Sequence, residues 1–296
     1  MAPTVDVASS PRPFGLRPRE LGIALATAGF LLMSLESPGL RLTELGSWEN
    51  TFWLGLFSAL SMFSWIRVRT GKSPLAAARD HRGPMLLSAA LQAASTLSFI
   101  LAIHHTTIAN IQVLFAATPA VGALLAQFTL GERASARTWL AIVASIAGML
   151  IVVSGSWGSA THGSIAGDLF ALLAMGAYTA NLAIWRKVPD LNREAVVGLG
   201  GVIMAACAVL AADLSTTTWR GLAIVVLLGM LSAPFGRVLV AIATRHLPVA
   251  QVSLLTPVET VAATTWAWLF LDEVPSNAAL LGGAIVLAAV SFGLRE

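Results

Sequence analysis

The sequence predicts an all-α integral membrane protein in which ten transmembrane helices form two inverted five-helix repeats. Three observations predict this fold: an apolar composition, ten apolar runs of spanning length, and an internal repeat. Of the 296 residues, 56% are hydrophobic and only 11% are charged, whereas about a quarter of the residues of a soluble domain are charged. Because one crossing takes about 20 residues, ten helices use up the chain. No room is left for an appended catalytic or nucleic-acid-binding module.

The apolar runs are separated by Pro, Gly and charged residues, as transmembrane helices are. A β-barrel is disfavoured because its strands alternate apolar with polar residues, whereas a segment such as 278–291 is apolar throughout. We predict helices at residues 21–40, 48–66, 85–103, 108–130, 137–154, 164–185, 194–212, 219–244, 248–271 and 277–294.

The start of the chain differs from the rest. Residues 1–20 contain four prolines and three arginines and few large apolar residues, a composition typical of a disordered segment. The apolar run that follows is too long for the hydrophobic region of a signal peptide. We therefore predict a disordered cytoplasmic tail at 1–20 that leads into the first helix.

The cations are distributed unevenly between the two sides of the predicted bundle. With the tail in the cytoplasm, fifteen of the 18 Lys and Arg residues fall on the cytoplasmic side, five of them in the segment 67–82. Only Arg41 and Arg220 fall outside, and Arg237 lies within a helix. This asymmetry follows the positive-inside rule and predicts an inner (plasma) membrane protein with both termini in the cytoplasm. It also explains the basic charge without a nucleic-acid partner.

The sequence contains a weak internal repeat. Shifting it by 141 positions aligns the turn Leu130-Gly131-Glu132 with Leu271-Asp272-Glu273, each between two long apolar runs. The repeats would then span residues 21–154 and 164–294. Because each holds five helices, an odd number, the second enters the membrane from the opposite side. Inverted repeats are typical of transporters, which bind substrate near the midplane between the copies.

The turn between these runs carries a resemblance to a known family. Pro119, an apolar run and Gly131-Glu132-Arg133 precede a helix with a glycine, and Pro257 through Asp272-Glu273 repeats the pattern more loosely, without the Arg. The chain thus resembles the drug/metabolite transporter superfamily and its EamA-type ten-helix permeases, and is similar in layout to the YddG-type amino-acid exporters. The resemblance implies a central cavity lined by the first, third, fourth, sixth, eighth and ninth helices, and alternating access.

Glu259 is the first candidate for the cavity, because an ionisable group at the bilayer centre costs about 2.5–3.5 kcal/mol unless it has a partner or water. It lies at the midpoint of the run 248–271, two residues after Pro257, which can bend the helix. In the repeat it aligns with Thr118 beside Pro119, so both copies would place a polar side chain at a bend. The alternative is a structural ion pair or hydrogen bond.

Two further charged residues are candidates. Arg237 follows Pro234 in a segment that weakens its helix; it could snorkel to the surface, bind a substrate carboxylate or pair with Glu259. Glu36, near the outer end of the first helix, could line a vestibule or lie among the headgroups.

The uncharged candidates are Tyr178 and Asn181, three residues apart on one face of a helix, and Gln92. Each could line the cavity or join helices by hydrogen bonds, worth about 0.6 kcal/mol on average. The tryptophans are expected to be interfacial anchors; Trp266 is the one we also place at the cavity.

No catalytic motif of a hydrolase, metalloprotease or nucleotide-driven pump occurs. The one cysteine, Cys207, lies in an apolar run, so neither a disulfide framework nor a Cys-based zinc site is expected. No catalytic residue, cofactor or metal is therefore predicted. The sequence favours a secondary transporter that exports small metabolites, amino acids first among them, with or without ion or proton coupling. The alternatives are a carrier of other metabolites or drugs, and an intramembrane scaffold or enzyme.

Overall fold

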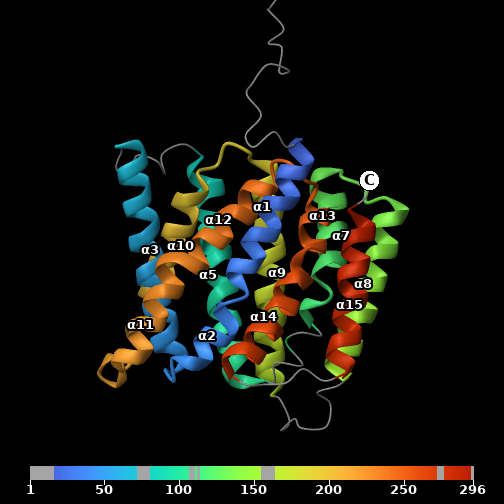
Figure 1. The fold of residues 1–296 in the computed structure, drawn as a ribbon. Helices are drawn as coiled ribbons and strands as arrows, with labels where there is room; N and C mark the ends of the chain where they lie inside the picture. The colour runs from blue at the N-terminus through green and yellow to red at the C-terminus, as the bar shows by residue number, and fades with distance from the viewer. Residues whose placement is uncertain are drawn as a thin grey trace, which may run out of the picture.

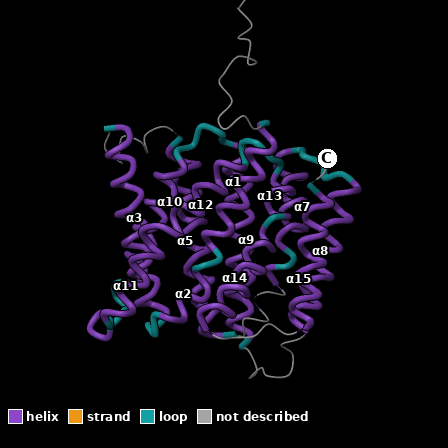
Figure 2. The backbone as a smooth tube through the Cα atoms, viewed as in Figure 1, coloured by secondary structure: helices purple, strands orange, loops and turns teal. Residues whose placement is uncertain are grey.

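The computed structural model describes residues 17–71, 81–106, 111, 114–154, 164–271 and 277–294. Within these ranges the chain forms helices joined by short turns and contains no strand (Figures 1 and 2). Of the predicted tail, residues 1–16 lie outside the described part. Its last three residues belong to the first helix instead, because Pro18 occupies the first helical position, where its missing N–H has no intrahelical role.

The helices of the first half follow the apolar runs. Within the described ranges, five helices or helix pairs are long and apolar enough to cross a membrane, and three of these belong to this half. The elements are α1 (Pro18–Met33), α2 (Glu36–Leu42), α3 (Ser47–Thr70), α5 (Arg82–His105), α7 (Thr118–Leu130) and α8 (Ala136–Ser154).

The second half repeats this alternation. Three of its helices, α9, α10 and α11, have N-cap side chains. The side-chain oxygens of Ser164, Asn192 and Thr218 accept hydrogen bonds from backbone N–H groups in the first turns of these helices. The elements are α9 (Ile165–Lys187), α10 (Arg193–Ala208), α11 (Trp219–Leu227), the π-helical turn η4 (Leu228–Ser232), α12 (Ala233–Ala243), α13 (Val249–Leu254), α14 (Thr256–Leu271) and α15 (Asn277–Gly293). The described parts of both halves are thus helical, as expected. The number of ten membrane crossings stays a prediction.

Four predicted continuous runs are interrupted, and in each case a proline lies close by. The run 21–40 breaks at residues 34–35, four before Pro38, because a proline ring leaves no room for the carbonyl of the residue four positions earlier. A turn at 116–117 precedes Pro119, a π-helical turn precedes Pro234, and a turn at Leu255 precedes Pro257. A bend or weakening was expected at Pro119, Pro234 and Pro257, and the helix is interrupted next to each of them; the break before Pro38 was not expected, because hydropathy does not register a missing backbone hydrogen bond.

The released backbone groups find other partners. The Ser61 hydroxyl donates a hydrogen bond to the carbonyl of Met230, 2.6 Å away, which Pro234 four residues later leaves without its helical donor. The Ser232 hydroxyl donates to the carbonyl of Leu32 at 2.5 Å. At two of the four interruptions, a backbone carbonyl is thus satisfied inside the protein, as a membrane interior requires.

The helix pairs respect a two-fold exchange of the halves. The most extensively packed pairs are α3 with α10, α8 with α15, α5 with α9, and α1 with α12. In the repeat, α1 corresponds to α9, α3 to α10, α5 to α12 and α8 to α15. When each helix is replaced by its counterpart, the pairs α3–α10 and α8–α15 map onto themselves, and the pairs α5–α9 and α1–α12 map onto each other. This pattern supports the predicted repeat.

The two halves also enter the bundle from opposite ends. The Arg19 guanidinium donates to the carbonyl of Leu294 at 2.7 Å, so the first and last described helices meet at one end, which we name the terminal end (Figure 1). By contrast, the backbone N–H of Ser164, which precedes α9, bonds the carbonyl of His105 at the finish of α5. Since α5 starts at the terminal end, α9 starts at the opposite end.

Candidate functional site

A cavity lies in the middle of the bundle, next to the helix interruptions. The space between its walls amounts to about 480 Å³, part of which is open to solvent. Side chains from α1, α2, α5, α9, α12 and α14 surround it together with Phe115, so both halves of the chain contribute. The lining residues are Met33, Glu36, Gln92, Ser95, Thr96, Phe99, Phe115, Tyr178, Arg237, Thr256 and Glu259.

A second hollow adjoins the first. The two share Phe99, Phe115, Thr256 and Glu259. The second continues along α14 past Pro257 to Ala263, and α14 runs away from the terminal end. The cavity therefore extends toward the opposite end of the bundle.

Glu36 and Arg237 form an ion pair in the cavity wall. The Nη1 and Nη2 atoms of Arg237 lie 2.8 and 2.9 Å from the two carboxylate oxygens of Glu36. The side chains are only 9% and 6% exposed. In this structure Arg237 is buried and its guanidinium fork matches the carboxylate of Glu36, which the break before α2 brings to the same depth, so it neither extends to the surface nor forms an ion pair with Glu259. Glu36 lies inside the bundle and not among headgroups.

A chain of hydrogen bonds continues from this pair. Arg237 Nη2 also donates to the Thr96 hydroxyl at 3.2 Å, and the Gln92 amide donates to the same hydroxyl at 3.2 Å. The Asn181 amide donates to Gln92 Oε1 at 3.2 Å, and the Ser88 hydroxyl donates to Asn181 Oδ1 at 2.5 Å. Ser88, Gln92 and Thr96 are four residues apart and share one face of α5. The chain joins α5, α9, α12 and α2.

Glu259 differs from Glu36 in having no cationic partner. In the described part of the chain its carboxylate makes no ion pair or hydrogen bond that meets ordinary geometric limits. It lies one turn into α14 on the face of Thr256, three residues earlier, and both line the cavity. The alternative of a structural ion pair is therefore not what the structure shows.

Two hydroxyl groups of the cavity wall also lack a well-formed hydrogen bond. Among the described residues, the hydroxyls of Tyr178 and Thr256 are buried and make no hydrogen bond of ordinary geometry, although the two lie close enough to interact with each other; each residue is 8% exposed. Buried polar groups are seldom left unpaired. Together with Glu259 they offer oxygen atoms for a bound molecule.

Five of the seven predicted cavity residues line the cavity, namely Glu36, Gln92, Tyr178, Arg237 and Glu259. Asn181 does not; it joins α5 and α9 instead. Trp266 does not either; its indole N–H donates to the Ser34 hydroxyl at 2.8 Å and ties α14 to the break before α2. Sequence reasoning missed Thr96 and Thr256, although Thr96 is one turn from Gln92 and Thr256 adjoins Pro257.

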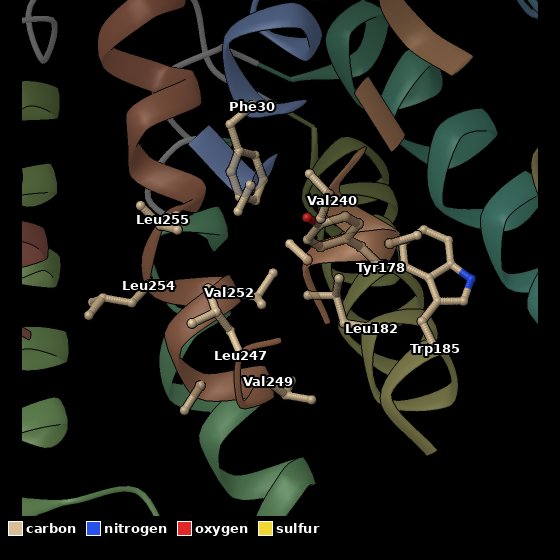
Figure 3. Packing of buried hydrophobic residues seen from close by; sticks show 14 of the residues in the cluster. Phe30, Tyr178, Leu182, Trp185, Val240, Leu247, Val249, Val252, Leu254 and Leu255 are labelled. Atoms are coloured by element: carbon tan, nitrogen blue, oxygen red, sulfur yellow. The ribbon is translucent and has the colours of Figure 1, made fainter. Parts of the chain in front are cut away.

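An apolar plug closes the cavity on its terminal side. One turn from a cavity residue in that direction, α1, α9, α12 and α13 each bury an apolar side chain: Phe30, Leu182, Val240 and Val252 are 0–1% exposed. These four residues, which we name the plug, are surrounded by further buried side chains such as Trp185 and Leu247 (Figure 3). Close packing of buried apolar side chains leaves little room for water on this side of the cavity.

Beyond the plug, Glu132 and Arg186 join the helix ends at the terminal end. Arg186 Nε lies 2.6 Å from Glu132 Oε1, and Arg186 Nη1 donates to the carbonyl of Thr244 at 3.0 Å. The backbone N–H of Val249 donates to Glu132 Oε2 at 3.3 Å. Glu132 follows Gly131, whose φ of 70° ends α7 in the left-handed conformation. The turn thus holds α7, α9, α12 and α13 together.

No cluster of three or more His, Cys, Asp or Glu side chains suited to a metal ion occurs in the ranges that the structure describes. The cavity offers carboxylate, guanidinium, hydroxyl, amide and aromatic groups. Such a set can hold a small amphipathic molecule with a charged group.

Comparison with known proteins places these features in a wider context. The sequence model of the EamA-like transporter family matches residues 20–154 and again residues 165–294. The chain is 27% identical over 211 residues to the "Pseudopaline exporter CntI" of Pseudomonas aeruginosa strain UCBPP-PA14, covering 70% of this chain and 73% of that protein. The protein of the same name from strain PAO1 is 26% identical over 215 residues, with the same coverage. A solved structure titled "Crystal structure of protein" superposes with a TM-score of 0.79 at 15% identity, over 92% of this chain and 95% of that one, which shows a shared fold.

Proposed function

The chain belongs to the EamA-like transporter family, and from that premise we propose that it exports small amphipathic metabolites of the amino-acid type through the central cavity. It is an integral inner-membrane transporter and not an enzyme. The proposal concerns its substrate, the residues that bind it and the path it takes.

One observation carries the proposal: Glu259 presents a carboxyl group without an ion-pair partner among the described residues to the central cavity. A charge in that position is costly unless a ligand or water meets it. The Tyr178 and Thr256 hydroxyls are available to the same molecule. The apolar part of an amphipathic substrate would contact Phe99 and Phe115, whose ring centroids are 5.6 Å apart.

The plug supports alternating access. The cavity extends toward the opposite end but is closed at the terminal end by Phe30, Leu182, Val240 and Val252. Transport would require the helices that carry these side chains to separate while the opposite end closes. The hinges for such a motion are the proline-linked breaks beside the cavity, where few backbone hydrogen bonds must change.

The curated relatives support the outward direction, since each is named as an exporter. Their sequence identity of 26–27% does not carry their substrate over to this chain.

Efflux from proteoliposomes tests the proposal. Vesicles containing the purified protein would be loaded with individual radiolabelled amino acids, with and without a pH gradient. We expect saturable efflux of a subset of them, absent in protein-free vesicles and strongly reduced by Glu259→Gln. The matched control is Glu194→Gln, which removes a carboxylate from a pair with the exposed Arg69 far from the cavity. Absence of efflux for every amino acid would refute the proposed substrate class.

A further inference from the structure

The cavity contains three charged side chains, and they are not equivalent. Arg237 is engaged by both oxygens of Glu36 and by the Thr96 hydroxyl. Glu259 has no such partner in the described chain. With both acids ionised, the three charges sum to one uncompensated negative charge, and it belongs to Glu259.

From this arrangement we infer that the cavity recognises its substrate by a positively charged amino group held at Glu259, and that a substrate carboxylate is not required. The inference rests on the proposed function, because it names the group by which that same cavity selects its substrates. The expected class is amphipathic amines, which includes amino acids and also their amides and esters.

The ion pair argues against binding of a substrate carboxylate by Arg237. Among the described residues that line the cavity, Arg237 is the only cation. For a substrate carboxylate to take it, Glu36 would have to release a bidentate contact at 2.8 and 2.9 Å and remain buried without a cation. Losing one partner of a buried pair is strongly unfavourable. Arg237 is therefore neutralised by the protein itself.

The oxygen atoms near Glu259 suit an ammonium group. An ammonium has three N–H donors and no acceptor. The Glu259 carboxylate and the hydroxyls of Tyr178 and Thr256 line the same cavity, and the two hydroxyls make no hydrogen bond of ordinary geometry in the described residues. All three can accept from a cation, whereas a carboxylate placed there would face Glu259 and be repelled.

The remaining wall suits an apolar group. Phe99 and Phe115 meet edge to face between the two hollows, and Ala116, Met149 and Ala263 line the second hollow. An aromatic or aliphatic group of a bound amine can lie there while its ammonium stays at Glu259.

A matched set of three probes tests the inference. L-phenylalanine carries both charges, L-phenylalaninamide carries only the ammonium, and 3-phenylpropanoate carries only the carboxylate. Thermal unfolding of the purified protein would be followed at increasing probe concentration, since a ligand of the native state raises the unfolding temperature. We expect a saturable rise with L-phenylalanine and L-phenylalaninamide, and an apparent affinity for 3-phenylpropanoate at least about tenfold weaker.

Two variants test whether the rise in unfolding temperature depends on Glu259. Glu259→Gln should abolish the rise with L-phenylalaninamide, and Glu194→Gln, matched in its charge change but distant from the cavity, should keep it. Equal or stronger stabilisation by 3-phenylpropanoate, absence of a rise with L-phenylalaninamide, or an undiminished rise in Glu259→Gln would each overturn the inference.

The proteoliposome assay separates the two proposals. Amino-acid efflux that is inhibited by 3-phenylpropanoate and not by L-phenylalaninamide would leave the proposed function intact and overturn the recognition by an amine. Binding of L-phenylalaninamide through Glu259 without efflux of any amino acid would instead refute the proposed function alone.

Discussion

Glu36 and Arg237 lie 201 positions apart in the chain, yet they form the bidentate ion pair in the wall of the central cavity. Each follows an interruption of its helix: Glu36 begins α2 after the break at residues 34–35, and Arg237 follows the π-helical turn and Pro234. The pair fixes the breaks of two different halves of the chain against each other and leaves Glu259 without a counter-charge among the described residues.

Glu36→Gln should destabilise the protein by about 3–5 kcal/mol, because it leaves the Arg237 guanidinium buried without a counter-charge. Replacing both residues by Met should cost much less, since no isolated charge remains. Thermal unfolding in detergent measures both. The control is Glu194→Gln, which removes an ion pair with Arg69. That pair is 3.5 Å long and the Arg69 side chain is 67% exposed, so the loss in the free energy of unfolding should be below about 1 kcal/mol. A cost for Glu36→Gln no larger than this control would contradict the structural role of the pair.

Glu259→Gln should leave the unfolding temperature nearly unchanged, because the carboxylate makes no ion pair among the described residues. Amino-acid efflux should nevertheless fall by about tenfold or more, which corresponds to about 1.4 kcal/mol of lost substrate interaction. Initial rates in proteoliposomes, normalised to the amount of incorporated protein, measure the effect. Normal efflux in a protein of normal stability would remove Glu259 from the site.

Asn181→Leu should lower stability modestly and spare transport. It removes hydrogen bonds to Ser88 and Gln92 between α5 and α9, and such bonds in membranes are worth about 0.6 kcal/mol on average and up to about 1.7. Efflux kinetics together with thermal unfolding check this. A large rise in KM at unchanged stability would place Asn181 at the substrate after all.

The charge asymmetry predicts the orientation of the bundle. Asp190, at the terminal end, and Ala211, at the opposite end, are both exposed. In a Cys207→Ala background, a cysteine at position 190 should react only with membrane-permeant thiol reagents in intact cells, and one at position 211 should also react with impermeant reagents. The reverse pattern would place the terminal end outside, against the positive-inside rule.

Glu132→Gln should loosen the terminal end, because it weakens the contacts that hold α7, α9, α12 and α13 together. A cysteine introduced at Thr256 in the Cys207→Ala background reports on access to the cavity. In inside-out vesicles, an impermeant thiol reagent should label it slowly, and severalfold faster when Glu132→Gln is added. If the added substitution does not change the rate, the Glu132–Arg186 contact does not keep that end closed.

Much of the fold could be predicted because hydropathy and charge are local properties of the chain. The apolar runs gave helices close to their expected positions, and the family match agrees with the transporter class read from the turn at Gly131-Glu132-Arg133. The interruptions of four runs were less visible. Prolines mark where a helix can break, but whether it does so depends on partners such as the Ser61 hydroxyl, which come from other helices.

The sequence by itself predicts that this chain enters a membrane as helices, that its cations gather at one end, and which polar residues lie at membrane depth. How those residues combine depends on the packing of the helices. Arg237 could have paired with Glu259 or Glu36, and the choice depends on how far each helix is rotated about its axis and on the depth at which each break falls. The rotation of each helix and the depth of each break are set by packing between segments that lie far apart in the chain, such as those of Glu36 and Arg237, 201 positions apart. Such packing leaves no periodic pattern in the sequence. Asn181 therefore became a contact between helices, while Tyr178, one turn away on the same helix, faces the cavity.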